Sequence, residues 1–160
     1  MNSVSIFDLT GKVALVNGGS RGIGEAIARG LAAQGATVLV SSRKQESVDA
    51  VAASLTAAGA TAKGYACHTG KAAEVAALFG KIRAEFGRLD ILVNNAATNP
   101  YFGPILEAPE TLYDKTFEIN CKGYFLMAQQ AARMMVEQGG GSIVNIASIV
   151  GETGNAGQVN

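Results

Sequence analysis

The sequence is poor in the residues that hold metal ions and disulfides. It contains one histidine, two cysteines and no tryptophan. The cysteines, Cys67 and Cys121, lie far apart and have no spacing typical of a zinc site, so we expect no metal. Two thiols without a disulfide framework are typical of a reducing compartment, and we therefore expect a cytoplasmic protein.

Net charge and long apolar runs are also lacking. Lysine plus arginine and aspartate plus glutamate both number 13, which leaves no charge to attract nucleic acid or an anionic membrane surface. No apolar run is as long as a membrane span, and residues 1–12 lack the charged segment and apolar core of a signal peptide. We expect neither a nucleic-acid partner nor a membrane partner.

Glycine is abundant, and short apolar runs alternate with longer helical patterns. The 160 residues fall within the size of one domain and include 20 glycines. Strands that alternate with long helices pair in parallel through right-handed crossovers. We therefore predict one Rossmann-like α/β domain over 1–160, with a doubly wound parallel sheet. The predicted strands span 12–17, 37–41, 60–67, 89–94 and 142–147; the predicted helices span 22–34, 44–58, 71–86 and 110–138, the first three ending at Gly35, Gly59 and Gly87.

A glycine-rich turn follows the first predicted strand. It reads NGGSRGIG over residues 17–24, and Gly18, Gly22 and Gly24 lie where the strand gives way to a helix. A diphosphate must approach the backbone N–H groups at a helix N-terminus, and a Cβ there would block it. The strand before and the helix after the trio are the context that a nucleotide site requires. The turn therefore predicts nucleotide binding, with an ordinary structural turn as the alternative.

The end of the second predicted strand indicates which dinucleotide is bound. NAD-specific proteins place a carboxylate here, which accepts a hydrogen bond from the ribose 2′-hydroxyl. This chain instead reads SSRK over residues 41–44, with no acid before Glu46. The hydroxyl of Ser42 and the two adjacent cations, Arg43 and Lys44, suit a 2′-phosphate, so we favour NADP over NAD. The alternative is a solvated helix start, although a cation there opposes the helix dipole.

Several motifs together resemble the short-chain dehydrogenase/reductase family. The glycine spacing is similar to that family's turn, with Asn17 in place of a threonine and expected to hydrogen-bond across to the next strand. Residues 94–97 read NNAA, similar to the family's Asn-Asn-Ala-Gly, and Asn120 and Ser148 lie where the family has a catalytic asparagine and serine. The segments SSRK, CHTGK and NAATNP look most similar to the member-4 subgroup of NADP-dependent carbonyl and retinal reductases. The resemblance extends over residues 9–160.

The resemblance implies hydride transfer between a nicotinamide and a small-molecule carbonyl or secondary alcohol, by a protein that forms homodimers or homotetramers. Ser148 is expected to bind the substrate oxygen, and Asn120 to hold a water in the proton relay. His68 and Thr69 follow the third strand, where the family contacts the adenine; a histidine there is as often merely exposed. The predicted cofactor-binding residues are Gly18, Ser20, Arg21, Gly22, Ile23, Gly24, Ser42, Arg43, His68, Thr69, Asn95, Ala96 and Ala97.

The family's proton donor is a tyrosine in a Tyr-x-x-x-Lys motif, in which the lysine lowers the tyrosine's pKa. The matching tyrosine would be residue 161, directly after Asn160, and none of the four tyrosines present has a lysine at the required spacing. We therefore expect a C-terminally truncated, inactive part of a reductase, whose apolar fifth strand is an unpaired edge. The alternative is a non-catalytic dinucleotide-binding protein that ends naturally at residue 160.

The reading frame after residue 160 distinguishes these two hypotheses. Truncation predicts that the frame continues with a tyrosine at position 161 and a lysine at position 165. Sequencing the transcript beyond the codon for Asn160 checks this, and a stop codon directly after it contradicts the hypothesis.

Overall fold

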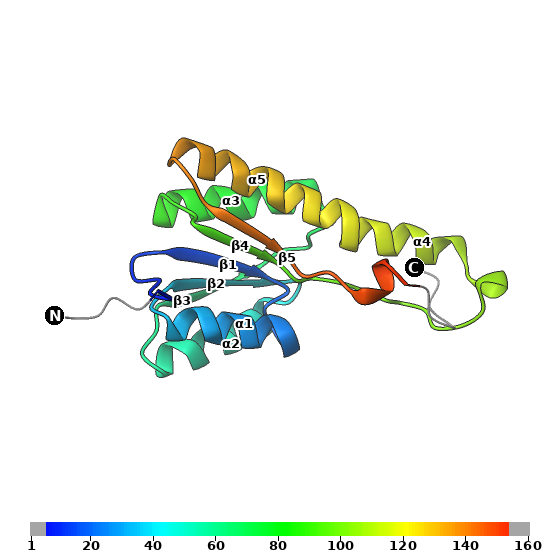
Figure 1. Cartoon of the computed structure of the whole chain (residues 1–160), viewed down its shortest axis with the longest axis horizontal. Helices are drawn as coiled ribbons and strands as arrows, with labels where there is room; N and C mark the ends of the chain where they lie inside the picture. The colour runs from blue at the N-terminus through cyan, green and yellow to red at the C-terminus, as the bar shows by residue number, and fades with distance from the viewer. Residues whose placement is uncertain (1–5, 154–160) are drawn as a thin grey trace.

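The structure, a computed structural model, describes residues 6–153. An all-parallel sheet runs through its centre in the order β3-β2-β1-β4-β5 (Figure 1). The chain moves outward from β1 to β3 and then crosses back to β4, which confirms the predicted doubly wound α/β fold. The strands are β1 (Val13–Asn17), β2 (Thr37–Ser42), β3 (Ala62–Ala66), β4 (Ile91–Asn94) and β5 (Ser142–Asn145).

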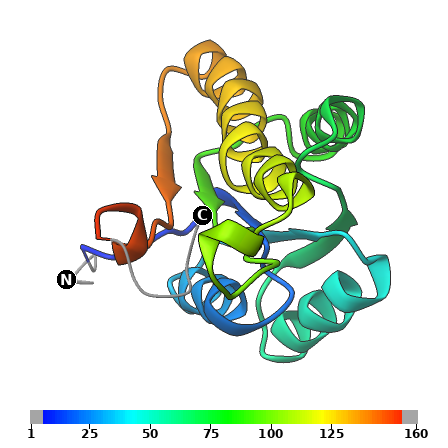
Figure 2. The ribbon, with the colours of Figure 1, turned by 90° about the vertical axis from the view of Figure 1, so that its right-hand side faces the viewer.

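Helices cover both faces of the sheet (Figure 2). Alternate residues of a strand point to opposite faces, so Leu15 packs in the core beneath α3 and α5 whereas Val16 packs in the core beneath α1 and α2. Both side chains are fully buried, which explains why the strands read as continuous apolar runs. These four helices are α1 (Gly22–Ala33), α2 (Gln45–Ala57), α3 (Ala72–Phe86) and α5 (Tyr124–Glu137).

The predicted helix stops are confirmed. α3 ends at Gly87, whose φ of 69° lets the chain leave the helix and turn toward β4. Gly35 and Gly59 follow α1 and α2 in the same way, each with a φ of 91°.

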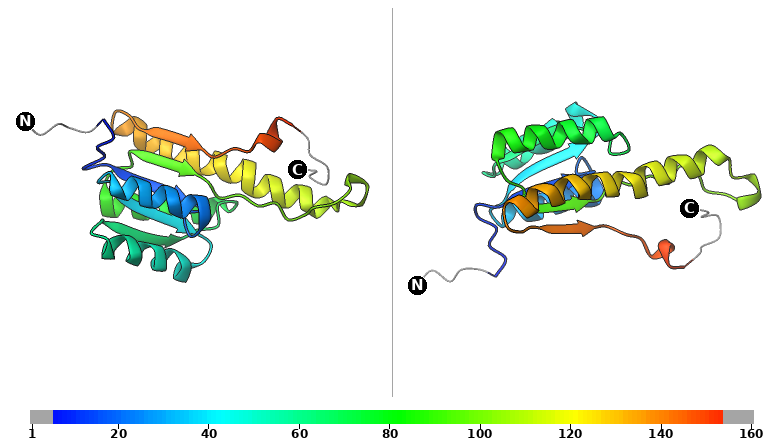
Figure 3. Two further views of the ribbon diagram at one scale, coloured as in Figure 1. Left: turned by 60° about the horizontal axis from the view of Figure 1, so that its bottom comes forward. Right: turned by 90° about the horizontal axis from the view of Figure 1, so that it is seen from above.

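The helix predicted over 110–138 is interrupted by a wider turn. The structure has α4 (Glu110–Thr116), then a π-helical segment, η2 (Phe117–Gly123), and then α5. The backbone stays helical throughout, so the three pieces form one long rod that extends past the end of the sheet (Figure 3). The prediction of a regular helix was therefore wrong at its centre. π-Helical turns are rare and occur often at functional sites, and Asn120 lies in this one.

The last strand is exposed rather than buried. β5 spans only four residues, ends before the predicted position 147, and pairs with β4 alone. Ile143 and Val144 are 36% and 44% exposed, because none of the strands within residues 6–153 lies on the outer side of β5. The apolar run looks like that of a buried strand, but the structure shows the unpaired apolar edge expected for the fifth strand. Two short 3-10 turns, η1 (Ile105–Glu107) and η3 (Ile149–Gly151), lie in the loops after β4 and β5.

No helix within residues 6–153 combines the length and apolar character needed to cross a membrane. The same residues contain no cluster of histidine, cysteine and carboxylate side chains that could hold a metal ion.

The amino ends of β1 and β4 are joined by a buried carboxylate. Asp90 accepts a hydrogen bond from the Val13 backbone N–H at 2.9 Å and two from the Arg88 guanidinium, at 2.8 and 2.6 Å. The side chain of Asp90 is 9% exposed. The hydrogen bonds from Arg88 outweigh burial, so the pKa of Asp90 lies below its ordinary value.

Replacing this carboxylate tests its contribution to stability. We expect Asp90→Asn to lower the free energy of unfolding at neutral pH by about 1–3 kcal/mol, because buried charge-assisted hydrogen bonds are lost. A lowered folded-state pKa stabilises the fold fully above the unfolded-state value of about 4, and that stabilisation disappears as the pH falls through the folded-state value. Denaturant titrations from neutral to acidic pH therefore converge for wild type and variant. Asp114→Asn, on exposed α4, is the control and changes stability by less than about 0.5 kcal/mol; equal effects of the two variants contradict the assignment.

Candidate functional site

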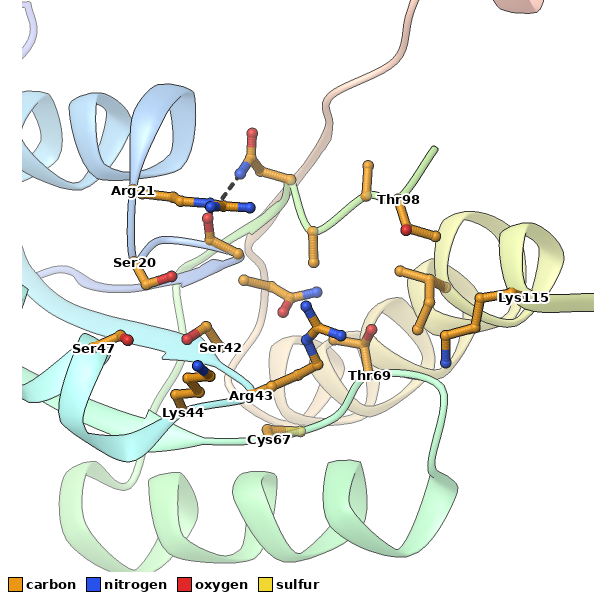
Figure 4. A pocket seen from close by; sticks show the side chains of 16 residues that line it. Ser20, Arg21, Ser42, Arg43, Lys44, Ser47, Cys67, Thr69, Thr98 and Lys115 are labelled. Carbon is orange, nitrogen blue, oxygen red and sulfur yellow. Dashed lines mark hydrogen bonds between the residues drawn. The ribbon is translucent and has the colours of Figure 1, made fainter. Parts of the chain in front are cut away.

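A cavity of about 450 Å³ opens at the carboxyl ends of the strands (Figure 4). The glycine turn after β1 lies on one side of it, and α4 and η2 lie on the other. This is the switch point of the sheet, where α/β proteins of this topology bind ligands. The cavity is lined by Asn17, Gly18, Ser20, Arg21, Ser42, Arg43, Lys44, Ser47, Cys67, Thr69, Asn95, Ala96, Ala97, Thr98, Lys115 and Ile119.

The glycine turn packs directly on the loop after β4. A Cβ on Gly18, whose φ is 77°, would stand 2.6 Å from the backbone of Ala96. A Cβ on Gly24 would overlap the Gly18 carbonyl oxygen and approach the side-chain nitrogen of Asn95 at 2.5 Å. That nitrogen donates a hydrogen bond to the same carbonyl at 2.9 Å. Glycine is therefore required at both positions for the two segments to meet.

Gly22 differs from these two glycines because open space lies beside it. Its φ is 57°, and a Cβ there would meet nothing within 4 Å. Gly22 begins α1, whose N-cap residue Arg21 makes no side-chain capping hydrogen bond. The first N–H groups of a helix have no partner within it, so they can bind an anion in this space. The turn thus has the geometry that a diphosphate group requires.

The cavity wall is cationic and carries hydroxyl groups. Arg21, Arg43, Lys44 and Lys115 line it, and no carboxylate of residues 6–153 is among the lining residues. Lys115 is paired with Glu118 at 2.8 Å, whereas the other three cations form no ion pair within residues 6–153. In Figure 4 the side chain of Arg43 extends into the cavity toward Thr69. Ser20, Ser42 and Ser47 add hydroxyl groups at the end nearest β2.

Most of the predicted cofactor residues lie together. The cavity is lined by Gly18, Ser20, Arg21, Ser42, Arg43, Thr69, Asn95, Ala96 and Ala97. Gly22, Ile23, Gly24 and His68 do not line it. Ile23 is 66% exposed on the outside of the turn, and Gly24 is enclosed beneath it. The backbone N–H of His68 donates to Glu74 at 2.8 Å, so its strand end is held toward α3. Cofactor contact stays a prediction for all of the predicted residues, whether or not they line the cavity.

Several residues that line the cavity were not predicted from the sequence. Ser47, in the first turn of α2, was not predicted, whereas Lys44 is the second cation expected beside Arg43. Lys115 and Ile119 come from α4 and η2, far along the chain, and only their four-residue spacing on one helix face could have suggested them. Cys67 is buried, which raises the pKa of its thiol to about 11 and keeps it protonated at neutral pH. Asn17 and Thr98 complete the missed residues.

Asn17 does not make the expected bond to the neighbouring strand. Its side chain is fully buried, and neither its amide nitrogen nor its oxygen has a partner within residues 6–153. Its register neighbours are Ser41 on β2 and Asn94 on β4. Adjacent strands lie about 4.8 Å apart, and these side chains do not close that gap. The turn is held to β2 instead by the Gly18 and Gly19 N–H groups, which donate to the Ser41 carbonyl at 2.7 and 3.2 Å.

The two predicted catalytic residues lie outside the cavity lining. Asn120 donates to the carbonyl oxygen of Thr98 and accepts from its N–H, both at 2.9 Å, so it clamps the backbone of a cavity residue. Ser148 is exposed in the loop after β5, and its oxygen accepts from the Val150 N–H at 3.4 Å. Their catalytic roles stay predictions.

A helix-opening glycine turn beside a cavity over the switch point is typical of the Rossmann fold class, in which many members bind dinucleotides. Within that class, a family model described as short chain dehydrogenase matches residues 12–160, and the chain belongs to this family.

Two curated relatives illustrate the relationship. Dehydrogenase/reductase SDR family member 4 of Homo sapiens is 47% identical over 141 residues, which cover 88% of this chain and 51% of the relative. D-threitol dehydrogenase of Mycolicibacterium smegmatis is 44% identical over 142 residues, covering 89% of this chain and 54% of the relative. The chain therefore spans about half the length of the curated relatives it matches. The resemblance to the member-4 subgroup is confirmed.

Two crystal structures share the fold over most of this chain. One, from Sinorhizobium meliloti 1021 and assigned as a short-chain alcohol dehydrogenase, has a TM-score of 0.91 at 38% identity and covers 97% of this chain. The other, a metagenomic short-chain oxidoreductase in complex with NADP, has a TM-score of 0.88 at 37% identity and covers 94%. This chain covers 61% and 68% of those two chains.

Two glycines of α1 provide a matched test of the turn. Gly24→Ala places a methyl group against the Gly18 carbonyl, and we expect it to lower the free energy of unfolding by about 1–3 kcal/mol. Gly30→Ala adds the same group to the same helix, where nothing lies within 4 Å, and we expect a gain of about 0.5–1 kcal/mol. Denaturant titration measures both. Similar values for the two variants contradict the close packing described for Gly24.

Proposed function

We propose that this chain is the NADP(H)-binding part of a reductase that transfers hydride between the nicotinamide and a carbonyl or secondary alcohol. The observation that carries the proposal is the cationic cavity wall without a carboxylate, next to a glycine turn open to a diphosphate. Membership of an oxidoreductase family supports the reaction type.

The cofactor preference rests on the end of β2. An NAD-type site needs a carboxylate there to accept from the ribose 2′-hydroxyl. This site has Ser42, Arg43 and Lys44 instead, with Ser47 one helical turn further on. A 2′-phosphate brings negative charge and acceptor oxygens, which unpaired guanidinium and ammonium groups bind well. The NADP complex of one structural relative is consistent with this choice.

The remaining residues have roles that follow from their positions. The N–H groups of the turn and α1 would hold the diphosphate, and Ala96 and Ala97 would border the rest of the dinucleotide. The bound cofactor supplies the hydride. Ser148 would hydrogen-bond the substrate oxygen, while Asn120 holds the loop at Thr98 in place. The 160 residues contain no Tyr-x-x-x-Lys motif, so we propose that the proton donor of the whole protein lies outside them.

The first experiment measures binding. We expect a folded sample of this chain to bind NADP⁺ more tightly than NAD⁺ in isothermal titration, because only NADP⁺ uses the cations beside β2. The whole protein should reduce a panel of small ketones and aldehydes with NADPH. Absence of binding to both coenzymes at millimolar concentration contradicts the proposal. Binding by a whole protein that has no activity would instead favour a non-catalytic dinucleotide-binding role.

Charge reversal at Arg43 tests the 2′-phosphate subsite. We expect Arg43→Glu to raise the Kd for NADP⁺ about 10-fold to 100-fold, the equivalent of one charge-assisted hydrogen bond, with a much smaller effect on NAD⁺. The fold should tolerate the change, because an acidic residue before α2 favours the helix dipole. Arg133→Glu, an identical exchange at an exposed position on α5, is the control and leaves both values within about twofold. A parallel loss of affinity for both coenzymes contradicts the subsite.

A further inference from the structure

The helical rod formed by α4, η2 and α5 carries two side chains that hydrogen-bond to different loops, one after β4 and one after β5. The side chain of Asn120 makes two hydrogen bonds to the backbone of Thr98, in the loop after β4. Tyr124, four residues further on, donates its phenolic hydroxyl to the carbonyl oxygen of Ile146, in the loop after β5, at 3.1 Å. Both loops run alongside the rod beyond the carboxyl ends of the strands (Figures 1 and 3).

The hydroxyl of Tyr124 bonds the backbone at the point where the pairing of β4 and β5 ends. The Ile146 N–H donates to the Asn94 carbonyl at 2.8 Å, which continues the β4–β5 pairing by one residue. Within residues 6–153, β5 is the edge strand of the sheet and has β4 as its single strand neighbour. The hydrogen bond from Tyr124 therefore fixes the carbonyl of the last paired residue before the chain turns toward Ser148.

The side chain of Asn94, on β4, hydrogen-bonds to both β5 and the helical rod. It is fully buried, and its side-chain nitrogen donates to the Asn145 side-chain oxygen at 2.9 Å and to the Tyr124 carbonyl at 3.5 Å. The end of β5 thus contacts the rod both through Asn94 and through the hydroxyl of Tyr124. These bonds leave the segment 145–146 little freedom to shift relative to η2.

Tyr124 remains a hydrogen-bond donor over the neutral pH range. Its ring is half-buried, and burial raises the pKa of its hydroxyl above the ordinary value. No lysine follows at the position that would lower that pKa, and the residue does not line the cofactor cavity. These properties suit a structural donor rather than a proton-transfer group.

We propose that Tyr124 is a positioning residue that orients the Ser148 loop for the reductase reaction. The proposal rests on the proposed function, in which Ser148 bonds the substrate oxygen. Ile146 lies two residues before Ser148, so a shift of its carbonyl moves the serine relative to the cofactor cavity. Misplacement of a reacting group by a fraction of an ångström is sufficient to slow a reaction measurably.

The test is Tyr124→Phe in the whole protein that contains this chain. The exchange removes only the hydroxyl and keeps the ring. We expect kcat for NADPH-dependent ketone reduction to fall about threefold to tenfold, the effect of losing one neutral hydrogen bond, while KM for NADPH stays within about twofold. Tyr113→Phe is the matched control: Tyr113 is exposed, its ring stacks on Phe117 and the exchange keeps that stacking, so kcat should not change. An unchanged kcat in Tyr124→Phe overturns the proposal.

A double-mutant cycle with Ser148→Ala separates positioning from a general loss of stability. If Tyr124 acts through Ser148, Tyr124→Phe causes no further loss of kcat once the serine hydroxyl is gone. An equal loss in both backgrounds shows that it acts elsewhere and overturns the proposal. The cycle is measured at enzyme concentrations high enough to follow the residual rate.

Amide hydrogen exchange gives a readout that is independent of activity. We expect exchange of the Ile146 N–H to accelerate at least about threefold in Tyr124→Phe and to stay unchanged in Tyr113→Phe. If the wild-type protein binds no nicotinamide coenzyme and reduces nothing, the proposed function fails while this exchange result still reports on the loop. Unchanged exchange in Tyr124→Phe overturns the positioning role whatever the activity.

Discussion

The cavity depends on the close approach of the glycine turn to the loop after β4. Gly18 lies against the backbone of Ala96, and Asn95 bonds the Gly18 carbonyl from the same loop. This contact sets where α1 begins relative to the rest of the cavity. Because β1 and β4 are adjacent and parallel, their carboxyl ends meet at one edge, and the absence of side chains at the glycines lets the two segments close over it.

A second set of contacts extends this arrangement to the edge of the sheet. Asn120 holds Thr98, Asn94 holds Asn145, and Tyr124 holds Ile146. The wider turn of η2 lies in the middle of these contacts, and the helix remains continuous on either side. The same rod therefore supports one wall of the cavity and the loop that carries Ser148. The exposed β5 is the part of the sheet with the fewest neighbours, which makes these side-chain bonds more important for its position.

Local patterns were sufficient to predict most of the fold. The buried strands read as apolar runs because helices cover both of their faces, and Gly87 ended α3 where its positive φ was needed. The pattern of Ile143 and Val144 alone looks the same in a central strand and at an edge, so the edge position of β5 was predicted from the resemblance and not from the local pattern. The glycine turn and Arg43 were found because their chemistry is local. Lys115 and Ile119 were not, because they approach the cavity only through tertiary packing.

The amino ends and the carboxyl ends of β1 and β4 contribute to different properties of the protein. At the amino ends, Asp90 joins the strands through the Val13 N–H and the Arg88 guanidinium; at the carboxyl ends, the same strands frame the cavity. Between the two ends, the side chains of both strands pack in the apolar core. Substitutions at the amino ends can therefore change thermal stability without changing the residues that line the cavity at the carboxyl ends. Sequence drift around Asp90 should be uncoupled from drift around Arg43.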